Sequence, residues 1–291
     1  MIPRFALARP STLAEAFAAF DGAGGDASWY AGGTELLQVM KMGLARFGTL
    51  IDLKGLPELR GIVVDGDGAL SIGAATTHRE IERSSTVGRE LAGLVGLEAQ
   101  VANVRVRNQG TIGGNLCFAE PHSDPATFLL ACGASVRLDG PGGPRELPMD
   151  AFLVSPFMTA READEIVVAI VIPGALAGEG RAYEKAKFRE RPAVSVAVRL
   201  RLAGGVVADA HVAVGSMTDI PIRVPVAESA LVGAPAEARA LGEALVAGSA
   251  AIAQLDAAED LDGSPDYKRH LAGVLLGRAA QAALVEAAAR A

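Results

Sequence analysis

Two glycine-rich segments contain the residue types best suited to bind an anion. The first has the sequence AGGT at residues 31–34 and lies between a predicted strand at residues 28–31 and a predicted helix from Glu35 to Met42. Paired glycines let a ligand approach the backbone closely, and N–H groups at the start of a helix point towards an anion. Thr34 adds a hydroxyl donor. A plain strand-to-helix turn is the alternative. The segment matches neither GxGxxG nor GxxxxGK(S/T), which disfavours the usual dinucleotide fold and the P-loop.

The second segment runs from Asn108 to Asn115 and contains three glycines, three side-chain amides and a threonine. Such a donor-rich stretch could wrap a diphosphate. A surface loop is less favoured, because the apolar Ile112 lies within it. Arg105 and Arg107 stand beside it, and they either contact phosphate or are solvated. Two such segments far apart in the sequence predict a two-sided clamp on one anion.

The composition excludes several classes of protein. The chain has 291 residues, 50% hydrophobic and 21% charged, with a formal net charge of -7. It can therefore form a substantial core, and it is not built mainly to neutralise nucleic-acid phosphates. Its two cysteines, Cys117 and Cys132, cannot alone build a disulfide framework or an iron–sulfur cluster, and they fit a reducing cytosol. The longest charge-free run, from Ile166 to Gly178, is too short to span a bilayer, and we expect no signal peptide.

The hydrophobic pattern divides the chain into three predicted units, at residues 1–55, 56–175 and 178–291. The first unit is a β–loop–α–β arrangement that follows an N-terminal helix. The second mixes short strands and helices. In the third, residues 193–202 alternate between the two sides of a strand, as expected when one face is buried. The predicted fold is therefore α+β, with two N-terminal α/β units followed by an antiparallel sheet and helices.

The remaining predicted elements follow from the same pattern. Further strands are expected at residues 49–53, 61–64, 69–72, 134–138, 165–172 and 206–215. Further helices are expected at residues 13–20, 77–83, 91–104, 124–132, 236–254 and 266–290. We expect the C-terminal unit to form its own core without contributing to the diphosphate site. The last helix would cover one face of its sheet through an apolar stripe made of Leu271, Val274, Leu275, Ala279 and Ala282.

Four longer motifs, in this order, resemble the flavin subunit of molybdenum hydroxylases. This family includes the medium subunit of carbon monoxide dehydrogenase and the FAD domain of xanthine dehydrogenase-type enzymes. The motifs are YAGGTELLQVMKMG from residue 30, VRNQGTIGGNLCFAEPHSDPATFLLACGASV from residue 106, YEKAKFRERPAVSVAVRL from residue 183 and SPDYKRHLAGVLLGRAA from residue 264. They span nearly the whole chain. Two departures are Glu35, where the family commonly has a small or shorter polar residue, and Lys268, where arginine is more usual.

The resemblance implies a bound FAD that the two N-terminal subdomains clamp. It places the diphosphate between residues 31–35 and 111–115. We expect the flavin ring near Ile112, against the Asp124 region and residues 183–187, because ligand sites favour places where two subdomains meet. No metal and no catalytic residue are expected in this chain, and the four histidines show no metal-site spacing. The implied cofactor-binding residues are Ala31, Gly32, Gly33, Thr34, Glu35, Thr111, Ile112, Gly113, Gly114, Asn115, Asp124 and Lys185.

Several of these residues have a second interpretation. Asp124 could bind the flavin or cap the helix that begins at Pro125. Lys185 or Lys187 could stabilise negative charge on a reduced flavin, and either could instead be a surface lysine. Trp29 could stack on adenine, although a core role is favoured.

The resemblance also implies a function. The chain would be an oxidoreductase subunit that receives electrons from [2Fe–2S] clusters of a small partner subunit and passes them to an external acceptor, while a large molybdopterin subunit oxidises the substrate. We expect a cytoplasmic dimer of heterotrimers, with no nucleic acid and no membrane span. The alternatives are a self-sufficient FAD-dependent oxidoreductase and a non-catalytic nucleotide-binding module.

Overall fold

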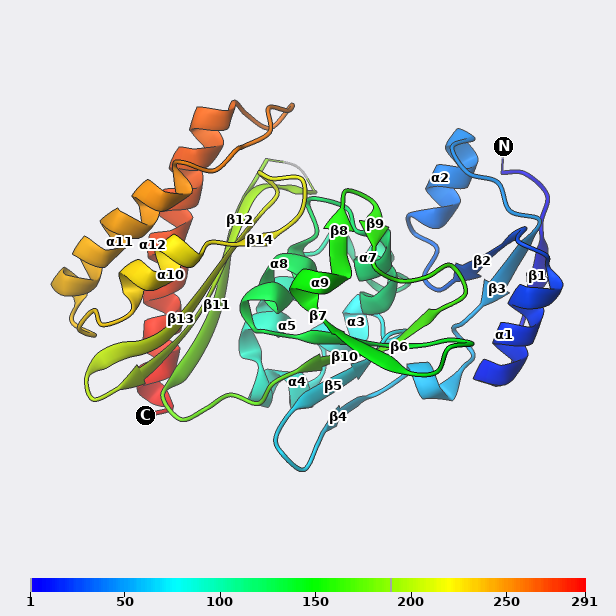
Figure 1. The fold of residues 1–291 in the computed structure, drawn as a ribbon, viewed down its shortest axis with the longest axis horizontal. Helices are drawn as coiled ribbons and strands as arrows, with labels where there is room; N and C mark the ends of the chain where they lie inside the picture. Colours follow the sequence, from blue (N-terminus) through cyan, green and yellow to red (C-terminus); the bar gives the residue numbers. More distant parts are fainter. Residues whose placement is uncertain (1, 189) are drawn as a thin grey trace.

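The computed structural model describes residues 2–188 and 190–291, without the side chains of residues 238–240. It has the predicted α+β fold, with a parallel sheet at one end, an antiparallel sheet in the middle and a second antiparallel sheet at the other end (Figure 1).

The N-terminal unit is a three-stranded parallel sheet with strand order β1-β3-β2. Its elements are β1 (Ala6–Ala8), α1 (Leu13–Gly22), β2 (Ala27–Tyr30), α2 (Leu36–Met42) and β3 (Thr49–Asp52). Thr12 caps α1 by accepting a hydrogen bond from the Glu15 N–H, and α2 ends at Gly43 in the left-handed conformation. The Trp29 ring stacks on Phe20 of α1 at 4.4 Å, so Trp29 has a packing role.

The central unit is built on a five-stranded antiparallel sheet with strand order β4-β5-β10-β6-β7. Its strands are β4 (Ile62–Val64), β5 (Leu70–Gly73), β6 (Ser135–Asp139), β7 (Arg145–Pro148) and β10 (Ile166–Ile172), and a small hairpin adds β8 (Leu153–Ser155) and β9 (Met158–Thr159). Its helices are η1 (Pro57–Leu59), α3 (His78–Glu82), α4 (Ser85–Glu90), α5 (Ala92–Glu98), α6 (Val104–Arg107), α7 (Ile112–Phe118), α8 (Asp124–Ala131) and α9 (Met149–Phe152).

Two expectations for the central unit, one helix and the glycine segment, need correction. The helix expected at residues 91–104 is wrong, because α5 ends at Glu98 and α6 begins afresh at Val104. Asn103 caps α6 by accepting hydrogen bonds from two backbone N–H groups. The second glycine segment is also not wholly a loop, since α7 begins inside it, with Thr111 as its cap.

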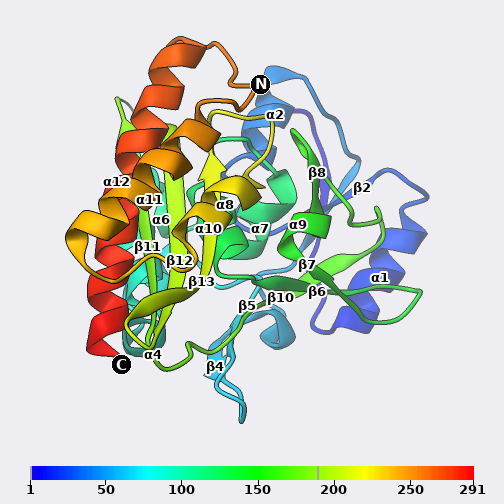
Figure 2. The ribbon, with the colours of Figure 1, turned by 60° about the vertical axis from the view of Figure 1, so that its left-hand side comes forward.

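The C-terminal unit is a four-stranded antiparallel sheet covered by helices on its outer face (Figures 1 and 2). Its elements are β11 (Glu179–Lys187), β12 (Pro192–Ala203), β13 (Val206–Gly215), β14 (Ile222–Arg223), α10 (Pro225–Leu231), α11 (Ala238–Ile252) and α12 (Pro265–Ala289). The predicted alternating strand is β12, and it lies in this sheet rather than in an N-terminal one. The inner face of the sheet contributes Ala197 and Ala213 to the core of the central unit.

The helix α12 covers the sheet with a different stripe from the predicted one. Leu275 and Ala279 are buried as expected, but Val274 is 41% exposed and Ala282 is exposed. The buried stripe instead runs through Ala272, Leu275, Leu276, Ala279, Ala280, Ala283 and Ala287. It is broader than predicted because α12 packs on α11 as well as on the sheet. Within the described part of the chain, α12 is the one helix whose length and apolar composition would allow it to cross a membrane, although this buried face is typical of a core helix.

Candidate functional site

The two glycine segments line one cavity of about 630 Å³, which is within the usual range for ligand sites. The cavity lies among all three units, because its lining residues come from β2 and α2, from the central helices and from the start of β12. Predicted site residues that line it are Ala31, Gly32, Gly33, Thr34, Glu35, Thr111, Gly113, Gly114, Asn115 and Asp124. Ile112 and Lys185 do not line it.

The two segments touch each other at Gly32. A Cβ atom at Gly32 would lie 2.3 Å from the Gln109 carbonyl oxygen and 2.7 Å from the Gly110 Cα atom, and real Cβ atoms do not approach other atoms so closely. Only glycine therefore allows this backbone contact between segments almost 80 residues apart. The sequence alone could not predict this close approach.

The first segment offers free backbone donors. Among the described residues, no acceptor pairs with the N–H groups of residues 32–35. Gly33 has a φ of +69°, a conformation that favours glycine and turns the chain from β2 into α2. This segment has the donors that a diphosphate needs, so it fits an anionic cofactor.

The backbone N–H groups of residues 112–115 in the second segment are already paired. Ile112 N–H donates to the Thr76 carbonyl and Gly113 N–H to the Ala74 carbonyl, at 3.1 and 2.9 Å. The Gly114 N–H donates to the Thr111 hydroxyl, which is the cap of α7. The segment is therefore held rigidly by its neighbours, and Ile112 is fully buried in the core.

Asn115 keeps a side-chain donor for the cavity. The Ser123 hydroxyl donates to its Oδ1 atom at 2.5 Å, which leaves the amide Nδ2 available. Ser123 is also the cap of α8, accepting from the Ala126 N–H. The alternative that Asp124 caps this helix is therefore wrong.

Asp124 belongs to a buried polar cluster at the edge of the cavity. Its carboxylate accepts hydrogen bonds from the Tyr183 hydroxyl and from Lys185 Nζ, the latter at 2.7 Å. The side chains of Asp124 and Lys185 are 6% and 2% exposed. Burial raises the pKa of Asp124, and the Lys185 charge offsets part of that rise. Burial also lowers the pKa of Lys185 and raises that of Tyr183.

Lys185 thus lies behind Asp124 rather than in the cavity, and its ammonium group also donates to the Gln100 carbonyl at 3.2 Å. The surface interpretation holds for Lys187, which is exposed, but not for Lys185. Arg107 neither reaches the cavity nor is merely solvated. It pairs with Glu82 at 2.9 Å and donates to the Val101 carbonyl.

The mouth of the cavity contains charged residues that the sequence analysis missed. Arg191, from the turn after β11, lies 3.1 Å from Glu120 and 3.8 Å from Glu35. Glu35 therefore has a positive charge close to its carboxylate. His122 lies between Glu120, at 2.8 Å, and Asp260 of the C-terminal unit, at 3.6 Å, and the hydrogen bond to Glu120 raises the pKa of His122. No cluster of metal-ligating side chains occurs among the described residues.

The chain is similar to known proteins along its whole length. A family model described as "FAD binding domain in molybdopterin dehydrogenase" matches residues 3–175, and one described as "CO dehydrogenase flavoprotein C-terminal domain" matches residues 181–283. The carbon monoxide dehydrogenase medium chain of Hydrogenophaga pseudoflava is 36% identical over 283 residues, or 97% of each chain. The xanthine dehydrogenase FAD-binding subunit of Escherichia coli O157:H7 is 33% identical over 209 residues, 70% of this chain and 72% of that one.

The fold is shared as well. The solved structure of carbon monoxide dehydrogenase from Hydrogenophaga pseudoflava, in a form lacking the Mo-pyranopterin moiety, matches with a TM-score of 0.92 at 36% identity. The match covers 98% of this chain and 99% of that one. The chain therefore belongs to the FAD-binding family of molybdopterin dehydrogenases. More particularly, it is an FAD-binding medium subunit of the carbon monoxide and xanthine dehydrogenase type, an oxidoreductase component whose cofactor is FAD.

Proposed function

We propose that this chain is the electron-transfer flavoprotein of a molybdenum hydroxylase, taking electrons from [2Fe–2S] clusters of a small partner subunit and delivering them to an external acceptor. The observation that carries this proposal is the contact of two glycine segments beside one cavity, with free N–H donors on the first segment. Bound FAD supplies the redox chemistry, and the protein supplies binding, orientation and electrostatics.

In this proposal each segment has a distinct part in holding the cofactor. The backbone N–H groups of residues 32–35 bind the diphosphate, and the Asn115 amide adds a donor on the opposite side. Gly113 and Gly114 let the second segment pack closely, because a Cβ atom would lie 2.5 Å from the Ala74 Cβ atom at Gly113 and 2.8 Å from the Thr111 hydroxyl at Gly114. Ile112 supports that surface from the core and does not itself contact the cofactor. Asp124 contacts the flavin half, with Lys185 behind it as a compensating charge.

The quaternary arrangement is part of the same proposal. The chain would join a small iron–sulfur subunit and a large molybdopterin subunit in a cytoplasmic dimer of heterotrimers. We propose subdomain boundaries at residues 1–55, 56–175 and 178–291. Two cysteines cannot build a cluster, so the electron donor must belong to another chain unless the substrate itself reduces the flavin.

The kinetic test uses carbon monoxide and xanthine, which the names of the relatives provide. We expect the isolated FAD-loaded chain to stay oxidised with either compound, and the complex with both partner subunits to be reduced by its own substrate. A strong chemical reductant, which should bleach the flavin absorbance in both samples, is the control. Rapid reduction of the lone chain by an organic donor would instead favour a self-sufficient oxidoreductase, and absence of bound flavin a nucleotide-binding module.

A further inference from the structure

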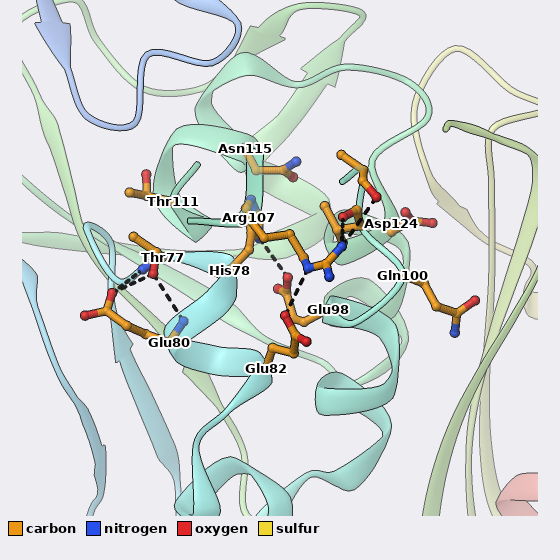
Figure 3. Close-up of polar contacts among 12 residues, drawn as sticks. Thr77, His78, Glu80, Glu82, Glu98, Gln100, Arg107, Thr111, Asn115 and Asp124 are labelled. Atoms are coloured by element: carbon orange, nitrogen blue, oxygen red, sulfur yellow. Dashed lines mark hydrogen bonds and ion pairs between the residues drawn. The ribbon is translucent and has the colours of Figure 1, made fainter. Parts of the chain in front are cut away.

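A buried histidine–glutamate pair lies directly beneath the second glycine segment. His78 Nδ1 and Glu98 Oε2 are 2.7 Å apart, and the side chains are 3% and 0% exposed. Figure 3 shows this pair below the start of α7, which carries Thr111 and Asn115. The family motifs quoted above do not include either residue, and neither has a part in the proposed function.

The pair is costly for a purely structural device. Glu98 Oε1 is buried without any hydrogen-bond partner in the described structure. Leaving a buried acceptor unsatisfied costs about 1–3 kcal/mol, and more for a charged group. A buried polar group without a partner therefore calls for an explanation, and a role in ligand binding is one such explanation.

The imidazole is part of the cavity wall. His78 lines the cavity, and its backbone N–H donates to the Gly110 carbonyl at 3.0 Å. A Cβ atom built on Gly110 would lie 3.1 Å from His78 Cδ2 and 3.5 Å from Nε2, so the ring packs against this glycine. Gly110 in turn touches Gly32 of the first segment. Gly110 therefore lies between the imidazole ring and Gly32, whose N–H is one of the free donors of the first segment.

The second ring nitrogen is available to a ligand. Nδ1 is occupied by Glu98, whereas Nε2 has no hydrogen-bond partner among the described residues. When a carboxylate holds Nδ1–H, a proton on Nε2 makes the ring a cation that donates into the cavity. A nearby anion stabilises that protonated form.

We propose that His78 Nε2–H donates a hydrogen bond to the FAD diphosphate, and that FAD binding takes up a proton at the His78–Glu98 pair. This proposal rests on the proposed function, since it requires FAD in this cavity. Glu98 then holds Nδ1 and fixes the orientation of the imidazole ring. The proton comes from solvent and remains on the ring while FAD is bound.

Several positively charged groups on the surrounding helices and strands are paired with other residues, so they do not replace a protonated His78. Arg107 of α6 is paired with Glu82 of α3, and Lys185 of β11 with Asp124 of α8. On α3 itself, Arg79 also pairs with Glu82, and Glu80 binds Arg60. Glu98 is therefore the charge that faces the imidazole directly.

The test measures FAD binding to the flavin-free full-length chain by calorimetry, in two buffers with different ionisation enthalpies. We expect the wild-type chain to take up a proton at mildly alkaline pH. His78→Gln should abolish this uptake and weaken FAD binding about tenfold, the effect of losing one charge-assisted hydrogen bond. Glu98→Gln should reduce both effects partially. His270→Gln is the matched control, because His270 is exposed on α12 and does not line the cavity.

Two further ligands identify the contact. ADP-ribose carries the same diphosphate and should reproduce the proton uptake, whereas riboflavin carries none and should not. Uptake with riboflavin alone would overturn the assignment to the diphosphate. Unchanged proton uptake in a folded His78→Gln chain would also overturn the proposal. If His78→Gln does not fold, unchanged proton uptake in Glu98→Gln would overturn it instead. If the wild-type chain binds FAD without taking up a proton, the inference about His78 fails and the proposed function stands. If the wild-type chain does not bind FAD, the proposed function fails as well.

Discussion

Replacing Asp124 with alanine is expected to destabilise the flavin-free protein by about 3–5 kcal/mol, the usual cost of removing one partner from a buried ion pair. Within the described part of the chain, the change leaves the Lys185 ammonium group, 2% exposed, with the Gln100 carbonyl as its remaining acceptor. It also removes the acceptor of the Tyr183 hydroxyl. Chemical denaturation followed by circular dichroism gives the free energy of unfolding.

Lys185→Met is the informative control, because the remaining carboxyl group can neutralise itself by binding a proton. Burial raises the pKa of Asp124, and removing Lys185 takes away the largest offset to that rise, leaving the smaller effects of Tyr183 and Lys187. A carboxyl group whose folded pKa exceeds its unfolded pKa favours folding below the unfolded pKa, and this advantage is lost as pH rises through the folded value. Lys185→Met should therefore be most stable in acid and lose stability towards neutral pH.

The double substitution Asp124→Ala with Lys185→Met should recover part of the lost stability, since it leaves no unpaired charge. If Asp124→Ala alone costs no more than an ordinary surface substitution, the pair is not buried as described. If the double variant is less stable than the sum of the two single changes, the residues do not act as a charge pair.

Local sequence signals predicted the elements around the cavity well. The helices predicted at residues 13–20 and 35–42 are present as α1 and α2, and Thr12 and Gly43 cap them through contacts with neighbours along the chain. The same kind of signal was present but misassigned at Ser123, which caps α8 in place of Asp124. In the second glycine segment, Thr111 begins a helix although two glycines follow it.

The features of the site that the sequence did not predict depend on contacts between segments that are distant in the chain. Segment 74–78 pairs with segment 110–113 through backbone hydrogen bonds. Such bonds do not depend on the side chains, so the sequence pattern cannot predict them. The direction of Lys185 depends on Asp124, 61 residues away, and only the register of β11 turns it inwards. The stripe of α12 was misplaced because two neighbours, α11 and the sheet, widen its buried face.

The contact between the glycine segments leads to a second large effect, at Gly32. Alanine there would put a methyl group 2.3 Å from the Gln109 carbonyl oxygen, where ordinary contact begins at 3.4 Å. The Gln109 oxygen and the nearby Gly110 Cα atom belong to a backbone segment that residues 74–78 hold in place. The first segment must therefore move by about an ångström. Overpacking of this kind typically costs about 1–3 kcal/mol.

The free N–H groups of residues 32–35 move with Gly32, and a displacement of about 1 Å is enough to disrupt a positioned site. We therefore expect Gly32→Ala to lower the amount of FAD bound per chain by about tenfold or more. Gly88→Ala in α4 is the matched control. A Cβ atom at Gly88 meets nothing within 4 Å, so flavin content should be unchanged and helix propensity should add slightly to stability. The measurement is the visible flavin absorbance per chain after purification, together with an FAD titration of the flavin-free protein. A folded Gly32→Ala chain with full flavin content would show that the first segment does not hold the diphosphate, whereas loss of flavin from both variants would point to general instability.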